Sequence, residues 1–203
     1  YLKETENQSL TSIKYKDGRV ASKNLSKLMG ENVFTNPKDP LLLKDIFKSL
    51  GINGDDIILD FFSGSGTIAE SVLSLNAEQN FNCRFILVQI QEDLNETLKI
   101  STGGSKATVQ RAINYLKERN LPENLCELAK ERIKKNFENI SNDLFSLLDL
   151  GFKVFRLSDS NIKGWDGKPD NLEHNLYDAV SNIKEDRTEE DVLCEILLKY
   201  GLD

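Results

Sequence analysis

"DDIILDFFSGSGTIAE", residues 55–70, joins an apolar run to an acid and then to two glycines that are one residue apart. The β-rich run at 56–61 predicts a short buried strand, and the apolar periodicity over 67–76 predicts a helix. Glycines let a backbone approach a ligand closely, and a helix N-terminus presents free N–H groups. A strand, a glycine turn and a helix in this order therefore indicate a ligand site.

The flanking segments extend this unit into an α/β pattern. A second buried strand is predicted at 83–90, "CRFILVQI", and a helical crossover between two such strands makes them parallel. Upstream, Asp39 is a predicted N-cap and Pro40 a first helical residue, with Gly51 ending that helix. Downstream, we expect a helix that starts at a Ser105 cap.

The remaining segments give weaker signals. Asp17-Gly18 within "SIKYKDGRV" predicts a β-hairpin, and residues 21–34 predict a loop with one helical turn. A helix is predicted over 124–140, a strand over 151–159, and a final helix after a Thr188 cap. A doubly wound sheet needs about five or six strands. We therefore expect either a small sheet or a sheet of which part lies outside this chain.

Composition narrows the class of protein. The 203 residues are 39% hydrophobic and 29% charged, which is ordinary for a soluble globular protein with one sizeable core. No apolar run approaches the roughly 20 residues that span a bilayer, so we expect no membrane contact. The three cysteines lie far apart and His174 is the only histidine, which favours a reducing cytoplasm and no metal site. The net charge of -7 argues against a nucleic-acid-binding surface within this chain itself.

Asp60 helps to decide which ligand the glycine turn would take. Residues 64–69 fit the dinucleotide pattern G-x-G-x-x-A, although the same string is also a common plain turn. Asp60 ends the strand four residues before Gly64, where its carboxylate would repel a pyrophosphate. A ligand with an amino group, a carboxylate and an adenosine suits this turn better, and S-adenosylmethionine is such a ligand.

The same residues carry a family resemblance. "ILDFFSGSGTIAESVLSLN" followed by "RFILVQIQE" resembles the cofactor motif of DNA amino-methyltransferases. More narrowly, it resembles the modification subunits of type III restriction-modification systems, which methylate the exocyclic N6 amine of adenine. "VFTNPKDPLLLKDIF" resembles the element that precedes this motif in the permuted β-class order. Stretches that resemble the following elements are "ELAKERIKKN", "DLGFKVFRLSDSNIKGWDG" and "NIKEDRTEEDVLCEILLKYGL", so the resemblance covers about residues 19–203.

The resemblance implies a fold, a domain layout and partners. The fold would be an α/β Rossmann-like methyltransferase fold with a partial sheet and a mostly helical C-terminal extension. Residues 1–33 would end a target-recognition region, 34–140 would bind S-adenosylmethionine, and 141–203 would form the extension. DNA and a restriction subunit would be partners, and the full-length subunit would form a homodimer.

The catalytic tetrapeptide of this family, of the D-P-P-Y type, is absent from the chain. The nearest string, Asn36-Pro37-Lys38-Asp39-Pro40, belongs to the element before the cofactor motif and has no aromatic residue in place. In the permuted order the tetrapeptide lies upstream. We therefore expect this chain to be the cofactor-binding, C-terminal portion of a larger subunit and to be inactive alone.

The glycine turn and its neighbours supply most of the implied cofactor site. Asp60 would accept a hydrogen bond from the ammonium group of the methionine moiety, or else serve as a plain capping acid. The glycines would let the backbone pass close to the cofactor, and the hydroxyls would donate to its carboxylate or act as ordinary caps. Phe61 and Phe62 would flank the adenine or the methionine chain, with one of them in the core. The other residues of the turn are Ser63, Gly64, Ser65, Gly66 and Thr67.

Two further groups complete the implied site. Gln89 stands where the family usually has an acid that holds the ribose, and Glu92 follows three residues later, so the ribose contact is open between them. The element before the motif would close over the methionine end, with Lys38 alternatively a solvated surface residue. Its residues are Phe34, Thr35, Asn36 and Lys38.

Two other function classes compete with this interpretation. One is an NAD-dependent oxidoreductase domain and the other a non-catalytic assembly module. "STGGSK", residues 101–106, lacks the spacing of a phosphate loop and predicts a turn into a helix. His174 and Trp165 are interpreted as structural residues.

Overall fold

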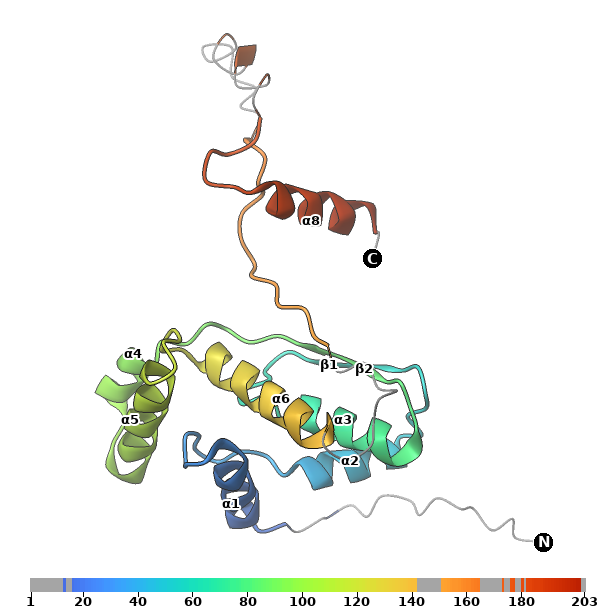
Figure 1. The fold of residues 1–203 in the computed structure, drawn as a ribbon, viewed down its shortest axis with the longest axis vertical. Helices are drawn as coiled ribbons and strands as arrows, with labels where there is room; N and C mark the ends of the chain where they lie inside the picture. Colours follow the sequence, from blue (N-terminus) through green and yellow to red (C-terminus); the bar gives the residue numbers. More distant parts are fainter. Residues whose placement is uncertain are drawn as a thin grey trace, which may run out of the picture. The chain divides into compact units, whose positions relative to one another are not determined.

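The computed structural model describes residues 13, 16–141, 151–164, 173, 176, 177, 180 and 182–201, which fall into two units, Tyr1–Gly151 and Phe152–Asp203. The second unit contains helix α8 (Glu189–Tyr200). The first unit contains, in chain order, α1 (Gly18–Met29), α2 (Pro40–Ser49), β1 (Ile57–Asp60), α3 (Thr67–Gln79), β2 (Arg84–Leu87), α4 (Leu94–Ile100), α5 (Gly103–Lys117) and α6 (Leu125–Ser141) (Figure 1).

β1 and β2 form a parallel pair in which Ile57 is opposite Arg84 and Asp60 is opposite Leu87. Helix α3 connects the two strands and contacts both of them, and α2 packs against α3. The predicted strand–helix–strand crossover and its parallel pairing are therefore confirmed. Figure 1 shows α2, α3 and α6 on the same side of the two strands.

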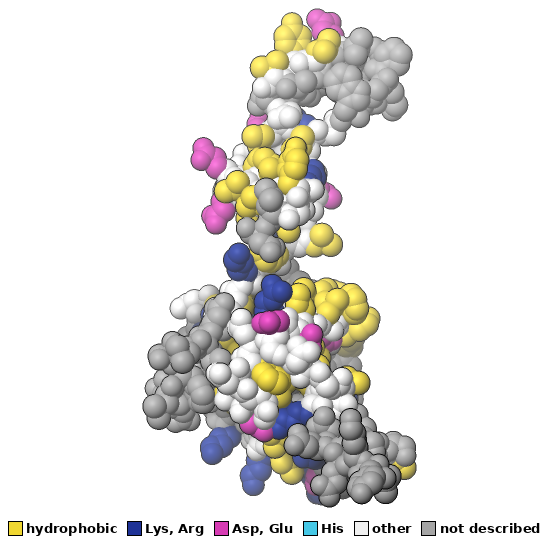
Figure 2. Space-filling model, turned by 90° about the vertical axis from the view of Figure 1, so that its right-hand side faces the viewer, with side chains coloured by type: hydrophobic (Ala, Val, Ile, Leu, Met, Phe, Trp, Pro, Cys, Tyr) yellow, Lys and Arg dark blue, Asp and Glu magenta, His cyan; other side chains and the backbone are white. Residues whose placement is uncertain are grey.

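Only one face of this sheet is buried. Ile58 points into the core with Phe47, Val72, Leu75 and Cys83. The residues that alternate with it on the other face are between 47% and 50% exposed, namely Ile57, Leu59, Ile86 and Val88. The prediction of two fully buried strands is thus wrong for this face, because no described helix of the first unit covers it. Figure 2 shows hydrophobic side chains at the surface of the first unit, at the height where Figure 1 draws the strands.

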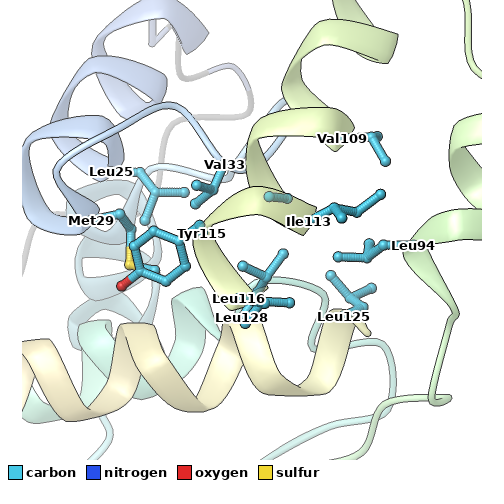
Figure 3. Close-up of a cluster of buried hydrophobic side chains, with 11 residues drawn as sticks. Leu25, Met29, Val33, Leu94, Val109, Ile113, Tyr115, Leu116, Leu125 and Leu128 are labelled. Atoms are coloured by element: carbon cyan, nitrogen blue, oxygen red, sulfur yellow. The ribbon is translucent and has the colours of Figure 1, made fainter. Parts of the chain in front are cut away.

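A second cluster joins α1, α4, α5 and α6. Its buried side chains surround Ile113 and Leu116 of α5, and Leu25 and Met29 of α1 contribute from the other side (Figure 3). Asp17 is the N-cap of α1 and accepts a hydrogen bond from the Arg19 N–H at 2.9 Å. The predicted hairpin at Asp17-Gly18 and the predicted loop over 21–34 are therefore wrong, since the apolar face of a full helix is buried here.

Helix boundaries follow the sequence signals in most places. Asp39 caps α2 with Pro40 in the first turn, and Thr188 forms a capping box with Asp191 at the start of α8, as predicted. Helix α5 starts at Gly103 after Thr102 instead of after Ser105, so the turn into a helix is confirmed but its cap is not.

The predicted strand over 151–159 is not formed. Residues 151–160 are described and contain no strand, and the side chains of Val154, Phe155 and Leu157 are exposed. His174 and Trp165 lie outside the described residues. No helix in the described part of the chain is long and apolar enough to cross a membrane.

Candidate functional site

The carboxyl ends of β1 and β2 place the loop after Asp60 next to the segment that carries Gln89. Asp60 is the last residue of β1, and its carbonyl oxygen accepts a hydrogen bond from the Val88 N–H at 2.8 Å. The Val88 carbonyl in turn accepts from the Ser63 N–H at 3.2 Å. The loop after β1 is thereby tied to the segment that leaves β2. This edge of a parallel sheet is where ligands bind in open α/β folds.

Both glycines of the loop adopt left-handed backbone conformations, with φ of 52° at Gly64 and 74° at Gly66. A Cβ atom at Gly64 would lie 3.6 Å from Cζ of Phe34. At Gly66 it would lie 3.6 Å from the Cβ of Ala129 on α6. The loop therefore passes between the Phe34 ring and α6, and its positive φ angles favour glycine at both positions.

Gln89 contacts the glycine loop directly. Its Oε1 accepts a hydrogen bond from the Gly64 N–H at 2.8 Å, and its Nε2 donates to the Ile90 carbonyl at 3.1 Å. The side chain thus links the end of β2 to the loop after β1. Glu92 lies elsewhere: its Oε1 accepts from the Thr97 hydroxyl of α4 at 2.7 Å. Of these two ribose candidates, only Gln89 is joined to the glycine loop by a hydrogen bond.

The thiol of Cys126 supports the segment that carries Gln89. Its Sγ lies 3.7 Å from the carbonyl oxygens of both Gln89 and Ile90. Burial raises the pKa of the Cys126 thiol, so the group stays protonated and able to donate to those carbonyls. Sequence reasoning gave no role to this cysteine, because its contacts are with backbone atoms far away along the chain.

The half-buried Asp60 and the two exposed phenylalanines that follow it form the rim of the site. Oδ1 of Asp60 accepts a hydrogen bond from the Phe62 N–H at 2.9 Å, and no donor among the described residues contacts Oδ2. Phe61 is 65% exposed and Phe62 is 86% exposed. The prediction that one of the two rings belongs to the core is therefore wrong. Both rings are available to a flat ligand or to another part of a larger protein.

The element before the loop contributes to a pocket of about 330 Å³. Phe34, Thr35 and Asn36 line one side of it, and Ser105 and Thr108 of α5 line another. Gly104, Ser22 and Asn32 complete the lining. Lys38 is exposed and does not line this pocket. The pocket walls are polar hydroxyl and amide groups, which suit a ligand with several hydrogen-bonding atoms.

Arg132 of α6 is a second residue that sequence reasoning missed. It is 2% exposed, and its Nη1 donates to the hydroxyls of Ser65 at 2.6 Å and Thr67 at 2.8 Å. The hydroxyls of Ser65 and Thr67 therefore point into the interior. A signal was present in the sequence, since Arg132 follows Leu128 by four residues and Ala129 by three and so lies on the apolar face of its helix.

The first turn of α3 has no side-chain cap. Its N-cap residue is Gly66, which offers no side-chain acceptor, so the N–H groups of the first turn have no side-chain cap. Such N–H groups bind carboxylates and other anions. Within the described residues, no three His, Cys, Asp or Glu side chains converge as metal ligands.

Comparison with known proteins shows which proteins this chain is similar to in sequence. Residues 3–99 match the model of a family described as DNA methylase. The Mod subunit of the type III restriction-modification enzyme StyLTI from Salmonella typhimurium is 35% identical over 141 residues. The EcoP15I Mod subunit from Escherichia coli is 34% identical over 156 residues, and the EcoPI Mod subunit from Escherichia phage P1 is 32% identical over 141.

These matches cover 69% to 74% of this chain but only 19% to 20% of the length of the Mod subunits. The chain therefore spans about a fifth of these curated relatives. The resemblance to type III modification subunits that the sequence motifs predict is confirmed by these identities.

Proposed function

Because this chain carries part of a DNA methylase domain and is similar to type III Mod subunits, we propose that it binds S-adenosylmethionine at the carboxyl ends of β1 and β2. The single observation that carries this proposal is the convergence of three distant segments there. Phe34 lies against Gly64, the Gly64 N–H donates to Gln89, and Asp60 ends the strand beside them. The mixed fold with its parallel strand pair would be the partial Rossmann-like domain of such an enzyme.

The charges at this edge of the sheet favour S-adenosylmethionine over a dinucleotide. Oδ2 of Asp60 is available to accept a hydrogen bond from an ammonium group. The first turn of α3 has no side-chain cap, and we propose that its N–H groups bind the carboxylate of the same amino-acid moiety. A pyrophosphate placed at the same edge would meet the Asp60 carboxylate.

The remaining site residues take the following proposed roles. Gln89, held against Gly64, would contact the ribose hydroxyls through its amide, with Glu92 the alternative. Phe61 or Phe62 would cover the adenine, since both rings are exposed. The pocket beside Phe34, Thr35 and Asn36 would receive a polar end of the cofactor.

The activity of the whole protein is part of the proposal. We infer that the protein to which this chain belongs transfers a methyl group to the N6 amine of adenine in a specific DNA sequence. Residues 34–140 would hold the cofactor, and parts outside the chain would hold the DNA and the flipped base. A restriction subunit would be its partner, a homodimer its assembly, and the reducing cytoplasm its compartment.

Calorimetry with S-adenosylhomocysteine, the demethylated product, tests cofactor binding in the protein at its natural length. Loss of a charge-assisted hydrogen bond costs about 1.5–3 kcal/mol. Asp60→Ala should therefore weaken binding about 10- to 100-fold. Asp60→Asn keeps an oxygen for the Phe62 N–H, so it separates the lost charge from a disturbed loop. Lys130→Met, a charge change on α6 that leaves Asp60 and the glycine loop unchanged, is the matched control.

The competing classes give different results in the same experiment. Binding of NAD with no binding of S-adenosylhomocysteine would favour an oxidoreductase domain. If neither ligand bound while the protein remained folded and dimeric, a non-catalytic assembly module would be favoured. Equal affinity in the wild type and Asp60→Ala would remove Asp60 from the site but would leave the cofactor assignment in place.

A further inference from the structure

We propose that Arg132 is a positioning residue that holds the glycine loop in the conformation that receives the cofactor. This inference rests on the proposed function, because the loop matters only if a ligand binds over it. Arg132 lies on α6, 65 residues after Thr67 in the sequence. It touches the interior side of the loop and not the exposed side.

The guanidinium group divides its donors between two elements. Nε and Nη2 donate to the same oxygen of Glu70, Oε2, at 2.9 and 2.7 Å. Nη1 donates to the hydroxyls of Ser65 and Thr67 and lies 3.4 Å from the Ser65 carbonyl oxygen. A single side chain thus connects both sides of Gly66 to the first turn of α3 and to α6. The planar, fixed fork of arginine suits this arrangement, whereas a lysine provides one mobile point charge.

The loop needs such an anchor. Two of its residues are glycines, which leave the backbone more conformational freedom than other residues do. The α3 N-cap has no side chain that could fix the start of the helix. The hydroxyls that could cap it, those of Ser65 and Thr67, are instead drawn inward by Arg132. Arg132 thereby holds both hydroxyls on the interior side of the loop.

A purely stabilising role explains the arrangement less well. Burying an arginine and a carboxylate costs desolvation energy, and well-packed apolar side chains of similar volume are often equally or more stabilising. Arg132 is almost fully buried while Glu70 is only three-quarters buried, so the ion pair is not optimised for the interior. What the arginine adds over an apolar side chain is the fixed direction of its donors towards the loop.

Loss of this anchor should lower the fraction of molecules whose loop is ready to bind. If that fraction falls to about a tenth, the apparent dissociation constant rises about tenfold. The effect should appear in the affinity for the cofactor and in its KM more than in kcat, since Arg132 does not reach the exposed side of the loop.

The experiment measures S-adenosylhomocysteine affinity by calorimetry and KM and kcat for methyl transfer, in the protein at its natural length. Arg132→Met removes the donors. Arg132→Met leaves the Glu70 carboxylate without its ion-pair partner. If that variant does not fold, the double variant Arg132→Met with Glu70→Gln replaces it, because both charges are then removed. Arg132→Lys tests whether charge alone is sufficient, and Lys130→Met is the control for losing a cation from α6.

We expect about tenfold weaker binding in Arg132→Met and in the double variant, an intermediate effect in Arg132→Lys, and none in Lys130→Met. A double-mutant cycle with Ser65→Ala should be non-additive, because the Ser65 hydroxyl and Arg132 act as a unit. Wild-type affinity in a folded Arg132→Met variant, or strictly additive effects in the cycle, would overturn the positioning role alone. If the wild type itself bound no S-adenosylhomocysteine, the proposed function would fail and this inference with it.

Discussion

Asn76 of α3 is expected to be a stability determinant of the sheet that carries the candidate site. Its side chain is 7% exposed and makes two hydrogen bonds to the backbone of Cys83, the residue that precedes β2. Nδ2 donates to the Cys83 carbonyl at 2.9 Å, and Oδ1 accepts from the Cys83 N–H at 3.0 Å. The carboxamide thus pairs with this backbone as a neighbouring strand would.

Removal of this amide should cost more than the two bonds themselves. An intramolecular hydrogen bond contributes about 0.5–1.5 kcal/mol net, but a buried backbone group left without a partner costs about 1–3 kcal/mol. Cys83 is 5% exposed, so water does not easily replace the amide. With two groups orphaned, Asn76→Ala should lower the free energy of unfolding of the first unit by about 2–4 kcal/mol.

Urea denaturation followed by the helical circular dichroism signal measures this change. Asn114→Ala on α5 is the matched control. The Asn114 side chain accepts one exposed hydrogen bond from Gln110 of the same helix, so its removal should change the free energy of unfolding by no more than about 0.5 kcal/mol. Asn76→Leu separates hydrogen bonding from packing, because it fills similar space and restores neither bond. Wild-type stability in Asn76→Leu would refute the reasoning, since the volume of the side chain would then be sufficient.

Other consequences are open to simple measurements. Gly66→Ala should destabilise the fold by about 1–2 kcal/mol in urea denaturation, because φ is 74° at this position. Gly104→Ala should be neutral or slightly stabilising, because φ is not positive there and a Cβ atom would meet no other atom within 4 Å. Salt bridges from Lys48 and Lys44 lower the pKa of Glu78 from its ordinary 4.5 to about 2. The resulting stabilisation is present above pH 4.5 and is lost as the pH falls towards 2, so Glu78→Gln should flatten the loss of stability over this range. With its net charge of -7, the 203-residue chain alone should bind duplex DNA only weakly at physiological salt, and tight sequence-specific binding in a fluorescence anisotropy titration would contradict this. Lacking a D-P-P-Y type tetrapeptide, the chain alone should transfer no tritiated methyl group to DNA, and measurable incorporation would place catalytic residues within it.

Signals that span a few residues were sufficient to predict much of the fold. The cap at Asp39 with Pro40, the cap at Thr188 and the crossover between the strands at 57–60 and 84–87 were read correctly from the sequence. These features depend on backbone groups and apolar periods that lie close together along the chain. The family resemblance came from the same kind of short motif.

Failures occurred where one local signal fitted two structures. Asp17-Gly18 suits a hairpin turn as well as a helix start. The helix formed because Leu25 and Met29 of α1 pack with Leu116 and Leu128 in a cluster assembled from four helices. The apolar run at 151–159 suits a strand, but no strand among the described residues pairs with it. A strand needs a partner, and a local pattern does not reveal whether one exists.

Local sequence patterns are sufficient to predict that an acid and a glycine turn stand at the end of a strand, and to detect the similarity of these motifs to a methyltransferase family. The side chains that shape that turn emerge only from the folded chain: Gln89 accepts from the Gly64 N–H, and Arg132 binds Ser65 and Thr67 from the interior. This is because a hydrogen-bonding group binds whichever partner the folded backbone leaves unsatisfied nearby. Gln89 and Gly64 are 25 residues apart in the sequence, and Arg132 and Ser65 are 67 residues apart. At such separations, spacing along the chain holds no geometric information.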